Sequence, residues 1–173
     1  FVSPKGYFDL YNREKIPIPK SSSDYLKTLP EPAAKSIRAK KNQINLDEAI
    51  SKEIKQAYYA SISFVDAQVG RILNVLEKTG LDKNTIVVFT SDHGYHLGEH
   101  GHWQKQTLFE NATRVPLIIA VPDMENELMI NSSPVELIDI YPTLMELTKI
   151  KTPSHVVGES LCPVLRKQSD SVR

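Results

Sequence analysis

The feature that most constrains the fold is a long amphipathic segment that ends just before a short apolar run. Between Asp47 and Gly80, apolar and small side chains recur every three or four residues, which is the spacing of one helix face. Asp47 is a suitable N-cap and Gly80 a suitable C-terminal stop. At ~1.5 Å per residue the helix would be roughly 48 Å long, enough to cross a whole domain.

The residues after this helix predict strands. Residues 85–90 are β-branched or apolar on both faces, as expected for a buried parallel strand, and residues 115–121 predict a second buried strand with Pro116 confined to its start. Residues 135–138 predict a short strand, followed by a helix over 139–149. A long helix followed by buried strands is typical of an α/β protein.

The beginning of the chain differs in composition from this part. Residues 1–46 contain five of the eleven prolines, spaced so that neither a long helix nor an interior strand can pass through them. Residues after Gly158 are polar and weakly patterned. We therefore divide the chain into a proline-rich loop region (1–46), a helix–strand part (47–158) and a polar C-terminal tail (159–173).

Composition excludes some functions. Lys plus Arg equals Asp plus Glu at 21 each, so the excess positive charge that attracts nucleic acid or an anionic membrane is absent. Apolar runs stay well below the ~18 residues of a membrane span. The single cysteine, Cys162, forms no internal disulfide and says little about compartment. The start, FVSPKGYFDLY, has no initiator Met and no signal-peptide pattern, which suggests a chain cut from a longer protein.

The segment Thr90 to Lys105, TSDHGYHLGEHGHWQK, concentrates side chains that can carry chemistry. It begins where a predicted strand ends, the position at which α/β proteins bind ligands. Asp92 and His93 can offer an oxygen and an imidazole nitrogen to one cation, while Gly94 allows a tight turn behind them. Lys105 can place an ammonium against an anionic substrate group.

These residues also have simpler interpretations. Asp-His-Gly is a common turn composition, and Lys105 alone can be a solvated charge. A zinc site built from the four histidines lacks the HExxH spacing of two imidazoles on one helix face. Taken singly, His96, His100 and His102 are typical of surface residues or of supports for a ligand.

The run AYYASISFVDAQVGRILNVLEKTGLDKNTIVVFTSDHGYHLGEHGHWQKQTLFENATRVPLIIAVP, residues 57–122, resembles sulfatases of the iduronate-2-sulfatase type without a gap. FVSPKGYFDLYNRE, VELIDIYPTLMEL and GESLCPVL extend the similarity more weakly to both sides. The resemblance implies a three-layer α/β/α sandwich of alkaline-phosphatase/sulfatase type, present only in part. It implies that Asp92 and His93 are two ligands of a calcium ion and that Lys105 contacts the substrate sulfate.

The family's nucleophile is a formylglycine made from a CxPSR-like motif. In this chain Cys162 lies in CPVLR, where proline follows at once and the serine is missing. We expect Cys162 to be an ordinary cysteine and the formylglycine to lie outside this chain, in a missing N-terminal part of the same domain or in a separate chain. Residues 1–173 alone would then be inactive and would associate with that part or aggregate. One of His96, His100 or His102 is a candidate to protonate the leaving oxygen.

By resemblance the substrate is a sulfated sugar or a glycosaminoglycan-derived saccharide, and the compartment is lysosomal, secreted or periplasmic. We expect neither nucleic acid nor membrane as a partner. Two alternatives stay open: a phosphoric or phosphonic ester hydrolase on the same fold, and a noncatalytic fragment that kept the fold. The Asp-His pair suits each of the two hydrolases, and a CxPSR-like motif before Phe1 would favour the sulfatase.

Overall fold

The structure is a computed structural model, and it describes residues 1–22, 24–38, 44, 46–124 and 129–172. The chain divides into two compact units, Phe1–Pro122 and Asp123–Arg173, which we describe separately. Within the described residues no helix is both long and apolar enough to span a membrane.

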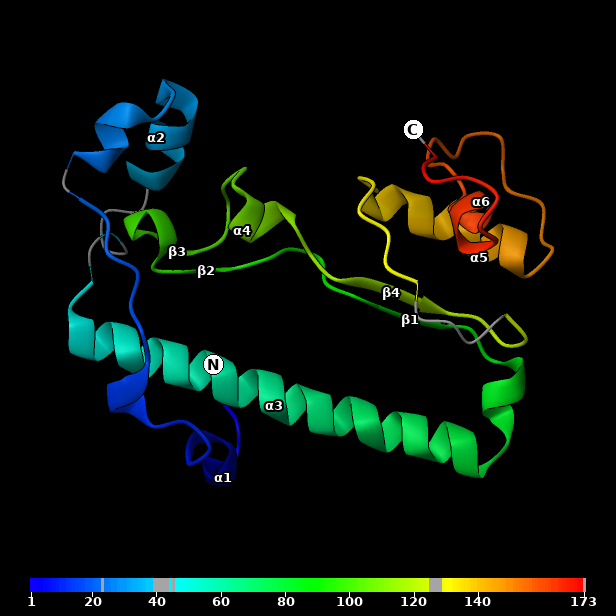
Figure 1. The fold of residues 1–173 in the computed structure, drawn as a ribbon, viewed down its shortest axis with the longest axis horizontal. Helices are drawn as coiled ribbons and strands as arrows, with labels where there is room; N and C mark the ends of the chain where they lie inside the picture. Colours follow the sequence, from blue (N-terminus) through cyan, green and yellow to red (C-terminus); the bar gives the residue numbers. More distant parts are fainter. Residues whose placement is uncertain (23, 39–43, 45, 125–128, 173) are drawn as a thin grey trace. The chain divides into compact units, whose positions relative to one another are not determined.

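Helix α3 (Glu48–Lys78) is the longest element of the first unit, and it confirms the predicted helix (Figure 1). The Asp47 carboxylate accepts hydrogen bonds from the backbone N–H groups of Ala49 at 2.8 Å and Ile50 at 3.4 Å, and so caps the N-terminus. After the last turn Gly80 takes a left-handed conformation, with φ of 70°. Glycine adopts this backbone without a side-chain clash, so the helix stops there.

Short helices occupy the proline-rich segment: α1 (Lys5–Phe8), η1 (Arg13–Lys15), η2 (Tyr25–Thr28) and α2 (Glu31–Arg38). Helix α2 was not predicted from the sequence. Pro32 lies in its first turn, where the missing N–H costs no hydrogen bond. Two buried polar residues of α3 hold the early part of this segment. Gln56 Nε2 donates to Tyr11 O at 2.8 Å, and Lys55 Nζ donates to Pro17 O at 2.8 Å. The first half of α3 is therefore covered by residues that precede it.

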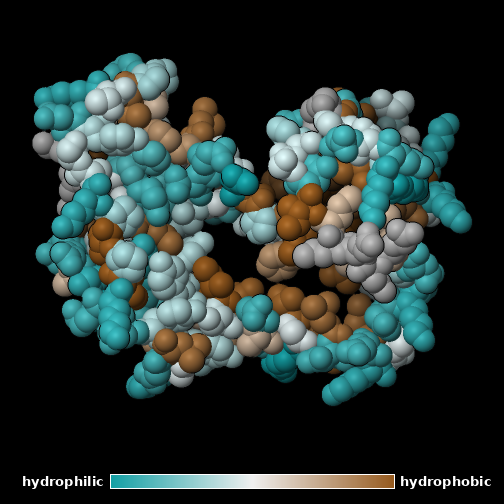
Figure 2. Space-filling view, viewed as in Figure 1, coloured by the Kyte–Doolittle hydropathy of each residue, from teal (hydrophilic) through white to brown (hydrophobic). Residues whose placement is uncertain are grey.

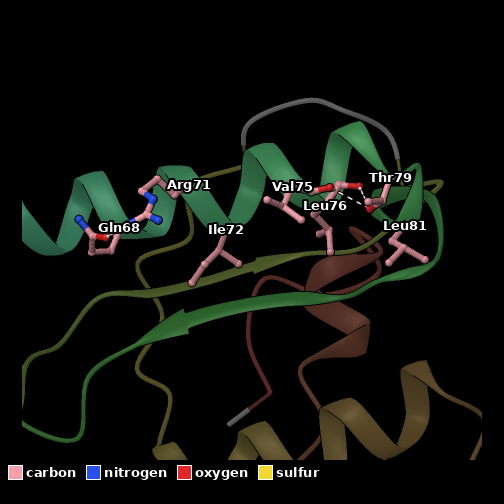
Figure 3. Close-up of a pocket in the computed structure, with 7 residues that line it drawn as sticks. All are labelled: Gln68, Arg71, Ile72, Val75, Leu76, Thr79 and Leu81. Atoms are coloured by element: carbon pink, nitrogen blue, oxygen red, sulfur yellow. Dashed lines mark hydrogen bonds between the residues drawn. The ribbon is translucent and has the colours of Figure 1, made fainter.

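The second half of α3 keeps much of its apolar face exposed. Ile72 retains 67% of its accessible surface and Val75 61%. Figure 3 shows Ile72, Leu76 and Leu81 pointing toward the strands, and a pocket of about 540 Å³ lies here, lined by Gln68, Arg71, Ile72, Val75, Leu76, Thr79 and Leu81. Apolar surface is also visible in Figure 2 over the second half of α3. The predicted apolar face exists, but the described residues leave it exposed along the second half of α3.

Strand β1 (Val87–Thr90) follows the 3-10 helix η4 (Leu81–Asn84) and pairs with β4 (Leu117–Ala120), with Val87 opposite Ala120 and Thr90 opposite Leu117. The pairing is antiparallel, so the predicted parallel arrangement of these two strands is wrong. A parallel pair needs a crossover that returns the chain to the same end of the sheet. The connection between β1 and β4 contains only short elements and brings the chain back in the opposite direction.

The connection between β1 and β4 carries the candidate site. It contains the two-residue strands β2 (His96–Leu97) and β3 (Trp103–Gln104), which pair antiparallel around the 3-10 turn η5 (Glu99–Gly101), and then the single-turn helix α4 (Glu110–Thr113). The Trp103 side chain is buried at 4% exposure. This small hairpin positions the later histidines and Lys105.

The second unit contains η6 (Leu137–Asp139), α5 (Ile140–Leu147) and α6 (Cys162–Leu165). The helix predicted over 139–149 is confirmed as α5, whereas the strand predicted over 135–138 is wrong. A capping box forms there instead: Asp139 Oδ2 accepts from Glu136 N at 2.8 Å, and the Glu136 side chain accepts from the backbone N–H of Asp139. Asp139 Oδ1 also accepts from the distant Glu159 N at 2.9 Å. These bonds favour a helical turn over an unpaired strand.

Candidate active site at the end of strand β1

Asp92 and His93 lie two and three residues beyond the end of β1, as the sequence analysis expected for ligand-binding residues. The Asp92 side chain is 83% exposed and the His93 side chain 33%. Asp92 Oδ1 accepts a hydrogen bond from His93 N at 3.1 Å, which limits the rotation of the carboxylate. Asp92 Oδ2 lies 3.4 Å from His93 Nε2. The two neighbouring side chains therefore turn ligand atoms toward the same point.

The tautomer of His93 follows from its neighbours. His93 Nδ1 lies 2.7 Å from Gly94 O, and a carbonyl oxygen can only accept, so Nδ1 carries the proton. The neutral ring then presents a lone pair at Nε2. Lys105 Nζ lies 2.5 Å from that Nε2 and donates to it. The Lys105 ammonium therefore lies directly against the His93 nitrogen that could bind a metal.

The backbone on both sides of Lys105 is unusual. Gln104 and Gln106 each have φ of 74°, in the left-handed region that non-glycine residues seldom adopt. Such conformations persist where the surrounding structure holds them, and they gather at functional sites. The residue types Gln104-Lys105-Gln106 do not predict a left-handed backbone. The lysine was found by resemblance, but the shape of its loop was not.

Gly94 is required for a reason that differs from the predicted turn. Its φ is not left-handed, but a Cβ at this position would lie 2.1 Å from the carbonyl oxygen of Asn111. Gly94 N also donates to Ala112 O at 2.8 Å. Close packing of the Asp-His-Gly backbone against α4 therefore excludes any side chain here.

The three later histidines lie mostly inside the first unit. His96 and His102 are completely buried, and their ring centroids are 5.1 Å apart. The His100 ring stacks on Phe109 at 4.2 Å between centroids, and its Nδ1 lies 2.5 Å from Tyr25 OH. Burial removes His96 and His102 from contact with a substrate, so neither suits the proposed role of proton donor to a leaving oxygen.

Burial also sets the charge of His96. Desolvation lowers its pKa from 6.5 to about 4, with the nearby His102 and His100 contributing in the same direction. Its Nε2 lies 2.7 Å from Thr107 Oγ1, and its Nδ1 has no hydrogen-bond partner among the described residues. Burial away from water disfavours the charged form of the ring. The ring is therefore neutral near pH 7.

The pair Asp92–His93 fits two positions of a divalent-cation site. Two ligands at right angles on an ion with bonds of about 2.4 Å are about 3.4 Å apart, which matches the separation of the two side-chain atoms. No cluster of three or more His, Cys, Asp or Glu suited to a metal occurs within the part of the chain that the structure describes.

Cys162 has the environment of a structural cysteine. It is completely buried, begins α6, and its Sγ lies 3.8 Å from Thr143 O. Burial raises the pKa of its thiol. A nucleophilic cysteine needs access and an easily formed thiolate, and Cys162 has neither.

Comparison with known proteins gives the class and then the family. A phosphonate monoester hydrolase from Silicibacter pomeroyi superposes with a TM-score of 0.85 and 27% identity, covering 97% of this chain and 35% of that one. The fold is thus the α/β fold of the alkaline-phosphatase-like hydrolases, present in part. The sulfatase family profile matches residues 14–150. The chain belongs to the sulfatase family.

Individual relatives agree with this assignment. A sulfatase from Formosa agariphila is 40% identical over 168 residues, which is 95% of this chain and 33% of that protein. Iduronate 2-sulfatase from Mus musculus is 51% identical over 77 residues, or 44% of this chain and 14% of that protein. The predicted resemblance is confirmed, and the chain spans about a third of the length of the first of these relatives.

Proposed function

We propose that the protein is a sulfuric ester hydrolase that releases sulfate from a sulfated sugar. In this proposal Asp92 and His93 are two ligands of a calcium ion, and Lys105 contacts the sulfate group. The observation that carries it is the convergence at His93 Nε2, where Asp92 Oδ2 lies at 3.4 Å and Lys105 Nζ at 2.5 Å. The family match supports the reaction, and the relative named for iduronate sulfate supports a sugar substrate.

The residues present have clear tasks in such a reaction. Cleavage of a sulfate ester develops negative charge on the sulfate oxygens and on the leaving oxygen. A bound divalent cation supplies charge stabilisation to those oxygens. Asp92 contributes a negative charge and His93 a neutral nitrogen, fixed in its tautomer by Gly94 O. Lys105 contributes an ammonium 2.5 Å from His93 Nε2, from where it can bind a sulfate oxygen.

The nucleophile belongs to a different part of the protein in this proposal. The one cysteine of the chain, Cys162, is buried and is followed by Pro163 rather than by a CxPSR-like sequence. We therefore expect a formylglycine outside residues 1–173, in the remainder of the domain. The small share of the relatives' length that the chain covers is consistent with this division. Residues 1–173 alone should show no turnover.

A phosphonic or phosphoric ester hydrolase is the second candidate, favoured by the similarity to the Silicibacter pomeroyi enzyme. The test is to measure kcat/KM of the complete protein on an aryl sulfate, on a sulfated disaccharide, and on an aryl phosphonate monoester. We expect the sulfate esters to be the better substrates. A clear preference for the phosphonate would replace the first candidate by the second, and turnover by residues 1–173 alone would contradict the placement of the nucleophile.

A further inference from the structure

The loop that carries Lys105 is tied at both ends to one residue, His96. On the near side, the backbone of His96 in β2 pairs with Gln104 in β3. On the far side, the His96 side chain places Nε2 2.7 Å from Thr107 Oγ1. Lys105 lies between these two attachments, and its neighbours Gln104 and Gln106 both have a left-handed backbone.

The attachment is shielded from water. His96 is completely buried, and Thr107 is 8% exposed. Thr107 Oγ1 also accepts from Phe109 N at 3.4 Å, and the Phe109 ring lies 6.0 Å from that of His96. A buried hydrogen bond whose partners cannot turn to water is costly to lose, so it can hold the strained loop in place.

We propose that His96 and Thr107 are positioning residues for Lys105, which hold its loop so that Nζ reaches His93 Nε2. This inference rests on the proposed function, because it assigns the two residues to the same reaction. Neither residue touches the reacting atoms. Their effect is on where the ammonium lies, and therefore on the transition state that it stabilises.

The protonation state of His96 favours a stable hydrogen bond to Thr107. His96 is packed against the rings of His100, His102 and Phe109, and the carboxylate of Glu99 is bound to Leu97 N at 2.6 Å. Burial and the two histidines keep the imidazole neutral near pH 7, so the bond to the Thr107 hydroxyl persists there. The hydrogen bond between His96 and Thr107 therefore persists near pH 7.

A double-mutant cycle in the complete protein tests the inference. Thr107→Val removes the hydroxyl with little change of shape, and Thr107→Ser keeps it. We expect Thr107→Val to lower kcat and kcat/KM on an aryl sulfate equally, by roughly 10- to 100-fold. Thr107→Ser should recover most of that loss. In a Lys105→Ala background, Thr107→Val should have little further effect, because the residue to be positioned is gone.

The outcomes separate the inference from the proposed function. Full, additive loss from Thr107→Val in the Lys105→Ala background would show a general structural role and overturn the inference, as would unchanged turnover in Thr107→Val alone. Unchanged turnover in Lys105→Ala would overturn the proposed role of Lys105, and the positioning role with it. Thermal melting of each variant identifies losses that come from unfolding, and in that case His96→Phe, which keeps a buried ring but leaves Thr107 without this partner, replaces Thr107→Val in the cycle.

Discussion

Lys105 Nζ lies 2.5 Å from His93 Nε2, although the two residues are twelve positions apart, one before strand β2 and the other after strand β3. A lysine held against an imidazole nitrogen at the edge of this exposed site is placed to meet an anion. We expect Lys105→Ala to lower kcat/KM on sulfate esters at least about 100-fold in the complete protein. Steady-state kinetics check this, with the exposed Lys83→Ala as the matched control.

The Asp92 side chain is 83% exposed, so its loss should affect chemistry much more than folding. We expect Asp92→Ala to lower sulfate-ester turnover by about 100-fold or more, because a metal ligand is removed. The free energy of unfolding should change by less than about 0.5 kcal/mol. Asp66→Ala, an exposed carboxylate on α3, is the control. Undiminished turnover in Asp92→Ala would show that the ligand assignment is wrong.

Gly94 and Gly70 form a matched pair. A Cβ on Gly94 would lie 2.1 Å from Asn111 O, whereas nothing lies within 4 Å of a Cβ on Gly70 in α3. Gly94→Ala should destabilise the protein by about 1–3 kcal/mol and reduce turnover, because the backbone of the Asp-His pair must shift. Gly70→Ala should instead stabilise it by up to about 1 kcal/mol. Chemical denaturation of the two variants measures the contrast, and equal effects would contradict the close approach.

The stability of the protein should fall in acid partly through His96. Its pKa is about 4 when folded against an ordinary value of 6.5, so between these values the unfolded chain binds more protons than the folded one. This contribution is fully present above pH 6.5 and is lost as the pH falls toward 4. Denaturation between pH 4 and 7 should show a smaller slope in His96→Gln than in the exposed control His155→Gln. Identical slopes would argue that His96 is not buried as a neutral ring.

Residues 1–173 alone should associate or aggregate. The second half of α3 exposes Ile72 and Val75 beside the 540 Å³ pocket, and apolar surface of this kind drives association. Ile72→Ser should increase the monomeric fraction of the isolated chain, measured by size-exclusion chromatography with light scattering. In the complete protein the same change should destabilise, since that face would be covered there. A monodisperse wild-type monomer of residues 1–173 would count against this prediction.

Local patterns in the sequence were sufficient for the helices with strong periodicity. The helix over 47–80 and the helix over 139–149 were both predicted, because capping residues and apolar spacing act within a few turns. The strand over 135–138 failed because the hydrogen bonds of Asp139, one of them to residue 159, decide that segment. The antiparallel pairing of β1 with β4 likewise depends on the path of the whole connection, which no local pattern reports.

By itself the sequence determined the family, the long helix α3, and the choice of Asp92, His93 and Lys105 as the residues to examine. The tertiary structure decided that these three side chains converge, that Gly94 is needed to clear Asn111 O, and that His96 and Thr107 hold the loop between them. The reason is physical. Capping and periodicity act between near neighbours along the chain, whereas burial, close approach and a strained backbone arise only when distant segments pack against one another.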